Sequence, residues 1–246
     1  MTSINNNTKP LIFLGSSMVM GKLFDVCDDH GIEIAGIIDN DYYGNRDAID
    51  GVPVIDTELS FDDKEKCRNY RDNYNFFCAN NWQPLADPIS VRNKTKRLNF
   101  LNLIESKELN CISLVSKTAS ISRRATLGRG VFIDTLAVIE PGVSIGDHSC
   151  VFAHAIVGHH MTLGKNCVVQ RKSFVAQASV AEDNCYFGLC TIILKSGVVF
   201  GKDTFVQEGI YLKRGTRPGE IVTPLSTPRV GSCWYPKLDN RTKEIK

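Results

Sequence analysis

The chain has 246 residues, of which 43% are hydrophobic and 23% are charged, and its formal net charge is +2. This composition is typical of a soluble globular protein, and the small net charge gives no reason to expect nucleic acid or an anionic membrane as a partner. No stretch resembles a transmembrane helix or the apolar core of a signal peptide. The nine cysteines form no CxxC pair, so we expect reduced thiols and a cytoplasmic protein.

The first part of the chain predicts a strand, a helix and a second strand. Residues 10–15 (PLIFLG) form an apolar run that ends at glycine, as expected of a buried strand. Residues 20–31 carry apolar side chains at helical spacing and also end at glycine. Residues 32–41 predict a strand that ends in acidic residues. Together they predict a βαβ unit.

Three more strands and one more helix are expected before the pattern changes. Residues 51–58 predict an edge strand, and residues 75–81 predict a strand with a polar exit. Residues 89–109 predict a helix, and residues 110–116 the strand that follows it. Residues 1–117 therefore predict an α/β domain, Rossmann-like and with a mainly parallel sheet.

A six-residue repeat begins at residue 121. An aliphatic residue recurs at thirteen consecutive positions of this period, and one extra residue between 194 and 199 shifts the phase. The repeat positions are Ile121, Leu127, Ile133, Ile139, Ile145, Val151, Val157, Leu163, Val169, Val175, Ala181, Phe187 and Ile193, followed by Phe200, Val206 and Leu212. This period is typical of a β-helix in which three hexads make one triangular coil. We therefore predict a β-helix domain over 118–214 and an extended tail over 215–246.

Residues 120–212 resemble the left-handed β-helix acyltransferases with hexapeptide repeats. With the preceding α/β domain, the chain resembles the sugar-acetyltransferase family that includes the bacillosamine and perosamine N-acetyltransferases and the sialic-acid O-acetyltransferase. The resemblance implies a left-handed parallel β-helix, a homotrimer, and acetyl-CoA lying between neighbouring β-helices. It also implies that the N-terminal domain binds the acceptor, often a nucleotide-linked amino sugar.

The resemblance assigns a general base to one of two adjacent histidines. Members of the family carry a histidine in a hexad reading roughly V-[ED]-H-D-C, and residues 157–161 (VGHHM) occupy that frame here. His159 therefore falls on the family's general base, and imidazole suits proton removal from an attacking amine near neutral pH. Gly158 and His160 replace the flanking acids. Glu140, one coil before Gly158, is the candidate that would hold the imidazole.

Other interpretations of these histidines remain open. From the residues alone, His159 and His160 could be ordinary turn residues of a repeat, while His160 could also contact coenzyme A phosphates or the acceptor. Gln177 lies in the next coil, where many relatives have glycine, and a main-chain N–H near it could bind the developing oxyanion. His154 and His159 have the spacing of two zinc ligands in β-helical carbonic anhydrases. Two imidazoles are too few for catalytic zinc, so no metal is expected.

A second group of candidate residues lies in the N-terminal domain. Gly15, Ser16 and Ser17 follow a strand and open a helix, where main-chain amides can hold a phosphate. The G-x-G-x-x-G pattern is absent, so a redox cofactor is not expected. Asp39 and Asn40 end the second strand and could bind a ribose or a base, or be a solvated strand exit.

The following strand and helix add three more acceptor-binding candidates. Asn80 and Asn81 end the fourth strand on the same expected edge of the sheet. Arg92 lies early in the next helix and could neutralise a diphosphate, although an arginine there is commonly just solvated.

The sequence thus predicts an acetyl-CoA-dependent N-acetyltransferase acting on a nucleotide-linked amino sugar, most plausibly a 4-amino-4,6-dideoxyhexose. O-acetylation of a sialic-acid-type sugar ranks lower, since a hydroxyl is a poorer nucleophile and would need the missing acids. The alternative from a different class is a non-catalytic trimeric β-helix scaffold or sugar-binding module.

Overall fold

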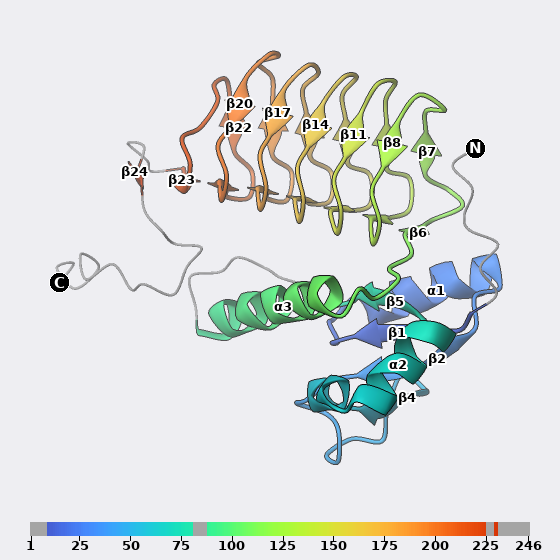
Figure 1. Ribbon diagram of the computed structural model, residues 1–246. Helices are drawn as coiled ribbons and strands as arrows, with labels where there is room; N and C mark the ends of the chain where they lie inside the picture. Colours follow the sequence, from blue (N-terminus) through green and yellow to red (C-terminus); the bar gives the residue numbers. More distant parts are fainter. Residues whose placement is uncertain (1–8, 81–87, 225–228, 231–246) are drawn as a thin grey trace, which may run out of the picture. The chain divides into compact units, whose positions relative to one another are not determined.

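The computed structural model describes residues 9–80, 88–224 and 229–230. The chain divides into two compact units, Ser3–Lys117 and Thr118–Lys246 (Figure 1). We call them the α/β unit and the β-helix unit. In the parts of the chain that are described, no helix is long and apolar enough to cross a membrane.

The α/β unit is built on a five-stranded sheet in the order β3-β4-β2-β1-β5, with parallel pairing throughout except between β3 and β4. Its elements are β1 (Leu11–Leu14), α1 (Met20–His30), β2 (Ile34–Ile38), β3 (Ala48–Ile49), β4 (Val52–Asp56), the 3-10 helix η1 (Glu58–Asp62), α2 (Lys64–Asn73), β5 (Asn75–Cys78), α3 (Pro88–Ser106) and β6 (Leu114–Val115). The four strands predicted before residue 82 and the two predicted helices are therefore confirmed. The elements η1, β3 and α2 were not predicted, and the strand predicted at 110–116 is reduced to β6, which is not part of the five-stranded sheet.

Two of the differences concern a helix and the edge of the sheet. Helix α2 was not expected, because its sequence KEKCRNYRDN carries almost no apolar side chain and none of its residues is buried. The predicted edge position of β4 is wrong, because the two-residue strand β3 pairs antiparallel along its outer side. Helix α2 and strand β3 both lie on the outside of the unit, where hydrophobic periodicity in the sequence is weakest.

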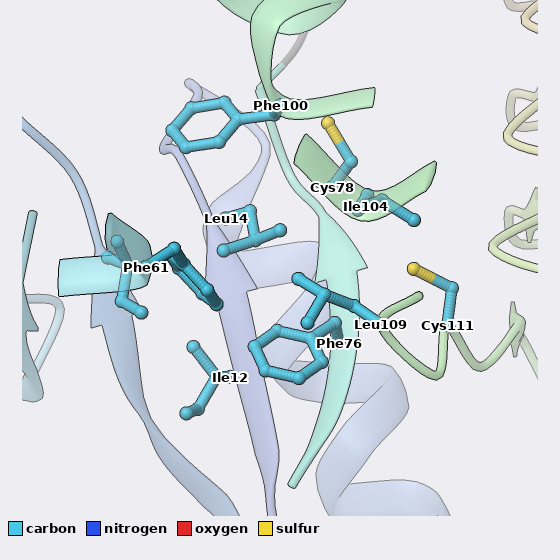
Figure 2. Close-up of a cluster of buried hydrophobic side chains, with 10 residues drawn as sticks. Ile12, Leu14, Phe61, Phe76, Cys78, Phe100, Ile104, Leu109 and Cys111 are labelled. Carbon is cyan, nitrogen blue, oxygen red and sulfur yellow. The ribbon is translucent and has the colours of Figure 1, made fainter. Parts of the chain in front are cut away.

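The core of the α/β unit forms around strand β1, which lies between β2 and β5 in the sheet. All four residues of β1 are fully buried, which explains why this strand is a continuous apolar run in the sequence. Figure 2 shows Ile12 and Leu14 of β1 among Phe61 of η1, Phe76 of β5 and Phe100 of α3. Because Phe100 and Ile104 of α3 belong to this core, the second half of the helix is packed against the sheet.

Asp56 ties α2 to the end of β4. Its carboxylate accepts hydrogen bonds from the Tyr70 hydroxyl at 2.9 Å and from Lys66 Nζ at 3.1 Å. It also accepts the main-chain N–H of Thr57 at 2.8 Å. Burial alone would raise the pKa of Asp56, but these three donors outweigh it and hold the pKa below its ordinary value.

We expect Asp56→Asn to lower the free energy of unfolding by roughly 1–3 kcal/mol at neutral pH, the cost of weakening a charge-assisted network. Because the folded pKa is depressed, this contribution is complete above the ordinary aspartate pKa and is lost as the pH falls through the lower folded value. Urea unfolding at several pH values measures it. Asp62→Asn is the control, since that side chain is 77% exposed and should change stability little. An equal loss in both variants would contradict the assignment.

The β-helix unit stacks short strands, all parallel except β24, into three sheets, visible as a series of coils in Figure 1. The first sheet runs β22-β19-β16-β13-β10-β7, the second β20-β17-β14-β11-β8, and the third from β9 through β12, β15, β18, β21 and β23 to β24. The strands are β7 (Ser120–Ile121), β8 (Thr126–Leu127), β9 (Phe132–Ile133), β10 (Val138–Ile139), β11 (Ser144–Ile145), β12 (Cys150–Val151), β13 (Ile156–Val157), β14 (Thr162–Leu163), β15 (Val168–Val169), β16 (Phe174–Val175), β17 (Val180–Ala181), β18 (Tyr186–Phe187), β19 (Ile192–Ile193), β20 (Val199–Phe200), β21 (Phe205–Val206), β22 (Tyr211–Leu212), β23 (Glu220–Val222) and β24 (Arg229–Val230).

The predicted six-residue repeat is confirmed strand by strand. Every predicted aliphatic position is the second residue of a two-residue strand, and from Ile133 onward each of them is buried. The extra residue before β20 is confirmed as well, because Val180 pairs with Val199, nineteen residues later, instead of the usual eighteen. The predicted tail begins later than residue 215, since Thr216 bridges Phe200 and β23 pairs with β21. The parallel β-helix is therefore established.

From the turn before β9 to the turn before β22, one residue at each turn between strands has a left-handed backbone conformation, and we call these residues the corner positions. They follow the six-residue spacing, with φ between 53° and 75°. They are Gly130, Leu136, Gly142, His148, His154, His160, Asn166, Lys172, Ala178, Asn184, Cys190, Gly197, Asp203 and Gly209. Apart from His148 and Asn166, which are buried, the side chains at the corners are exposed or half-buried, so their chemistry is not fixed by the packing of the interior.

Candidate functional site

His159 and His160 lie together on the turn between β13 and β14, and both are exposed. His160 occupies a corner position with φ 59°. The two Nδ1 atoms are 3.0 Å apart, and the rings meet edge to face at 87° with centroids 5.2 Å apart. One Nδ1 therefore carries a hydrogen and donates it to the other.

The main chain at His159 is fixed from both neighbouring coils. Its N–H donates to Glu140 Oε2 at 2.7 Å, and its carbonyl accepts the N–H of Ala178 at 2.9 Å. The N–H of His160 donates to the carbonyl of Pro141 at 3.0 Å. The histidine pair is thus carried on a backbone with little freedom to move, although its rings face solvent.

Glu140 lies one coil from Gly158, as the stacking predicted, because β10 and β13 pair in register. Its carboxylate accepts a hydrogen bond from the main-chain N–H of His159, and not from the imidazole ring. Similar bonds recur along the β-helix, from turn N–H groups to acids of a neighbouring coil: Ala153 to Asp134, Arg129 to Asp147, Lys165 to Asp183 and Lys202 to Glu182. Glu140 therefore shares a structural task with other acids, and a direct part in catalysis stays a prediction.

Gln177 lies one coil after His159 and is half-buried. Its carbonyl accepts the Ser179 hydroxyl at 3.3 Å, while its N–H has no acceptor among the residues that the structure describes. A Cβ on Gly158 would be 2.7 Å from this nitrogen, so glycine at that position lets the coils approach here. An N–H without an acceptor, one coil from an exposed imidazole, is suited to bind a developing negative charge.

At the carboxyl ends of the strands in the α/β unit, Gly15 brings the first turn close to β5 and α3. Gly15 has φ 74°, and a Cβ there would be 2.7 Å from the ring of Phe100 and 2.9 Å from the Cβ of Asn80. Only glycine fits this conformation and this space. The sequence prediction that Gly15 and Asn80 share one edge of the sheet is confirmed.

Asp39 is the charged centre of this edge and is fully buried. Its Oδ2 accepts the Ser16 hydroxyl at 2.8 Å, and its Oδ1 accepts the main-chain N–H of Asp41 at 2.9 Å. Lys96 on α3 donates to Asp39 Oδ1 at 2.6 Å and to Asp41 Oδ2 at 3.0 Å. The predicted residues Ser16 and Asp39 are therefore joined, and their counter-ion comes from α3.

Asn40 pairs with Glu58, the first residue of η1. The Asn40 amide donates to the Glu58 carboxylate, and its carbonyl accepts the Glu58 main-chain N–H, both at 2.8 Å. Burial raises the pKa of Glu58 above its ordinary value, opposed by Lys96 and reinforced by Asp39. Asn40 is thus hydrogen-bonded to a residue that follows strand β4, and it is not only a solvated residue at the end of β2.

Two buried polar atoms at this edge have no hydrogen-bond partner within the described ranges, namely Ser17 Oγ and Asn80 Oδ1. Both belong to predicted acceptor-binding residues. A buried oxygen without a partner costs free energy, and a bound ligand can supply the missing group. Asn81 lies outside the described residues, and Arg92 lies in α3 with its side chain outside them.

Lys96 and Glu58 were missed by the sequence analysis, although both carry a signal. Lys96 follows Arg92 by four residues, so both occupy one face of the same helix. Glu58 follows β4 just as Asp39 follows β2, and parallel strands bring such exits to one edge. Across the described residues there is no group of three or more His, Cys, Asp or Glu side chains that could hold a metal ion.

The fold of the chain is similar to that of several solved structures. A perosamine N-acetyltransferase mutant from Caulobacter crescentus, solved with CoA and GDP-perosamine, matches with a TM-score of 0.74 and 19% identity over 89% of this chain and 96% of that one. WeeI from Acinetobacter baumannii matches with a TM-score of 0.67 and 16% identity over 90% and 99%. The acetyltransferase domain of PglB from Neisseria gonorrhoeae matches with 0.65 and 15% over 90% and 100%. No protein-family model and no curated protein sequence matches the chain.

Proposed function

We propose that the chain is an N-acetyltransferase that transfers an acetyl group from acetyl-CoA to the amino group of a nucleotide-linked amino sugar. The observation that carries this proposal is the exposed imidazole of His159 on a turn whose main chain is bonded to both adjacent coils. The similarity of the whole fold to a perosamine N-acetyltransferase solved with CoA and GDP-perosamine supports the same reaction class.

In the proposed reaction the sugar amine attacks the carbonyl carbon of the thioester. His159 takes the proton that the amine loses as the C–N bond forms. The N–H of Gln177 has no acceptor among the described residues and would donate to the oxyanion of the tetrahedral intermediate. Collapse of this intermediate breaks the C–S bond, and the thiolate of CoA leaves and is protonated, so that one amide and one thiol are formed.

The acceptor nucleotide is assigned to the edge of the α/β unit. The two buried oxygens without partners, Ser17 Oγ and Asn80 Oδ1, favour a ligand that donates hydrogen bonds, as a base or a ribose hydroxyl does. The turn at Gly15 leaves main-chain amides for a diphosphate. In this proposal Asp39 and Lys96 form the fixed wall of the site, since they already neutralise each other.

We also propose that the chain forms a homotrimer. Exposed apolar side chains gather toward the last coils of two sheets, with Ile192 and Tyr211 on one and Val180 and Val199 on the next. Contiguous apolar side chains on a protein surface are typical of an interface. Sedimentation of the purified chain at one monomer mass would contradict this assignment.

The proposed function is tested by incubating the chain with acetyl-CoA and a panel of GDP-, UDP- and dTDP-linked 4-amino-4,6-dideoxyhexoses. We expect release of free thiol that depends on the amino sugar, and a product heavier by one acetyl group. The matched control is the same panel with a hydroxyl in place of the amine. Transfer to hydroxyl sugars alone would favour an O-acetyltransferase. Absence of transfer to every acceptor would favour the scaffold interpretation and refute the proposal.

A further inference from the structure

We propose that His160 is a positioning residue that holds His159 in the tautomer required of a general base. This inference rests on the proposed function, because it concerns the same proton transfer. His160 occupies a position at which the family that the sequence resembles usually carries an acid. The hydrogen bond between the two Nδ1 atoms, 3.0 Å apart, is the observation that supports it.

The geometry limits how the two rings can share protons. If His159 donates its Nδ1–H to Nδ1 of His160, then Nε2 of His159 carries the free lone pair and can accept a proton from the amine. In the reverse arrangement Nε2 of His159 carries the hydrogen and cannot act as a base. A free neutral imidazole in water prefers its hydrogen on Nε2, so the partner at Nδ1 decides the outcome. The hydrogen lies on Nδ1 of His159 in the proposed arrangement, because only then is Nε2 of His159 free to act as the base.

His160 is itself held in place. Its left-handed backbone, with φ 59°, and the bond from its N–H to the carbonyl of Pro141 fix the direction in which the side chain leaves the coil. Its ring lies against Gly142 in the preceding coil, where an added Cβ would be 2.8 Å from Cδ2 and 3.0 Å from Nε2. Glycine at the corner below therefore makes room for the imidazole.

The neighbouring acid does not take this role in the structure. The recorded bond of Glu140 Oε2 goes to the main-chain N–H of His159, and the recorded hydrogen bond of the His159 ring goes to His160. The carboxylate of Glu140 therefore holds the backbone of this turn and not the imidazole of His159. His160 thus supplies the hydrogen-bond partner of the His159 ring, while the carboxylate of Glu140 is bonded to the main chain of the same residue.

The decisive experiment compares His160→Ala and His160→Glu with wild type. Loss of the Nδ1 partner should lower kcat for amine acetylation by about 10–100-fold, in line with the cost of removing a group that orients a catalytic imidazole. The KM for acetyl-CoA should stay within about twofold of wild type. His160→Glu restores an acceptor for Nδ1–H and should recover most of kcat. His154→Ala is the matched control, since His154 is an exposed corner residue with the same φ of 59°.

A second measurement does not depend on activity. Heteronuclear NMR of the imidazole nitrogens should show His159 protonated on Nδ1 in wild type and on Nε2 in His160→Ala. A wild-type spectrum with Nδ1 unprotonated overturns the inference, as does a raised KM for acetyl-CoA with unchanged kcat. If the NMR change is observed but wild type acetylates no amino sugar, the proposed function fails while the positioning role stands.

Discussion

Replacing His159 by asparagine is expected to lower kcat for amine acetylation by about 10²–10⁴-fold, the usual contribution of a general base. The fold should be retained, because the recorded bonds from this residue to the neighbouring coils come from its main-chain N–H and carbonyl. Asparagine keeps a polar side chain of similar reach but cannot take up a proton. Initial rates at saturating acetyl-CoA and acceptor, together with a thermal melt, separate loss of chemistry from loss of structure.

His154→Asn is the matched control for this variant. His154 is exposed on the turn preceding β13, one hexad before His160. It should keep wild-type rates and an unchanged melting temperature. A His159→Asn protein that retains a rate within about threefold of wild type would show that the amine needs no base at this turn, and the proposed chemistry would then be wrong.

Lys96→Met should be the most destabilising exchange at the edge of the α/β unit. Lys96 is 13% exposed and binds Asp39, whose side chain is fully buried. Removing the cation leaves a buried carboxylate held by Ser16 and a main-chain N–H alone. Breaking such a pair costs about 3 kcal/mol. Chemical denaturation monitored by circular dichroism measures the free energy of unfolding.

A double variant tests whether the effect of Lys96 comes from its charge. In the double variant Lys96→Met with Asp39→Asn no charge is left buried, so most of the lost stability should return. Lys107→Met serves as the control, since Lys107 pairs with the exposed Asp62 at 3.9 Å and should matter by less than about 0.5 kcal/mol. If the double variant is as unstable as the single one, the effect of Lys96 is packing and not charge.

The β-helix could be predicted to the residue because its repeat has one physical cause. Each coil buries one apolar side chain per strand, so Ile133, Val157 and Phe187 all fall on the six-residue period and the period is visible directly. Even the extra residue before β20 follows from the shifted phase. The α/β unit was predicted as well wherever a buried apolar run marked a strand, as in β1. Helix α2 has no buried face, and its sequence therefore gives no comparable signal.

Most residues of the candidate sites were predicted, but the hydrogen-bond partner of each of them was not. Stacking placed Glu140 one coil from Gly158, but which atom the carboxylate meets depends on the course of the turn, and no pattern encodes that. Lys96 was missed because a lysine in a polar helix looks like a solvated residue until the helix is packed against the sheet. The contact between His159 and His160 likewise depends on one left-handed backbone residue.

The corner positions give this scaffold an unusual capacity for evolutionary change. Leucine, lysine, asparagine, cysteine and histidine all occupy the same backbone conformation at different turns, and the interior stacks beneath them without interruption. A single codon change at a corner can therefore introduce or remove a reactive group without rebuilding the core. The corner at residue 160 shows the geometry that such a change needs, because the imidazole of His160 lies against Gly142 in the coil below, where an added Cβ would be 2.8 Å from Cδ2. New specificities can arise here by independent steps at separate turns.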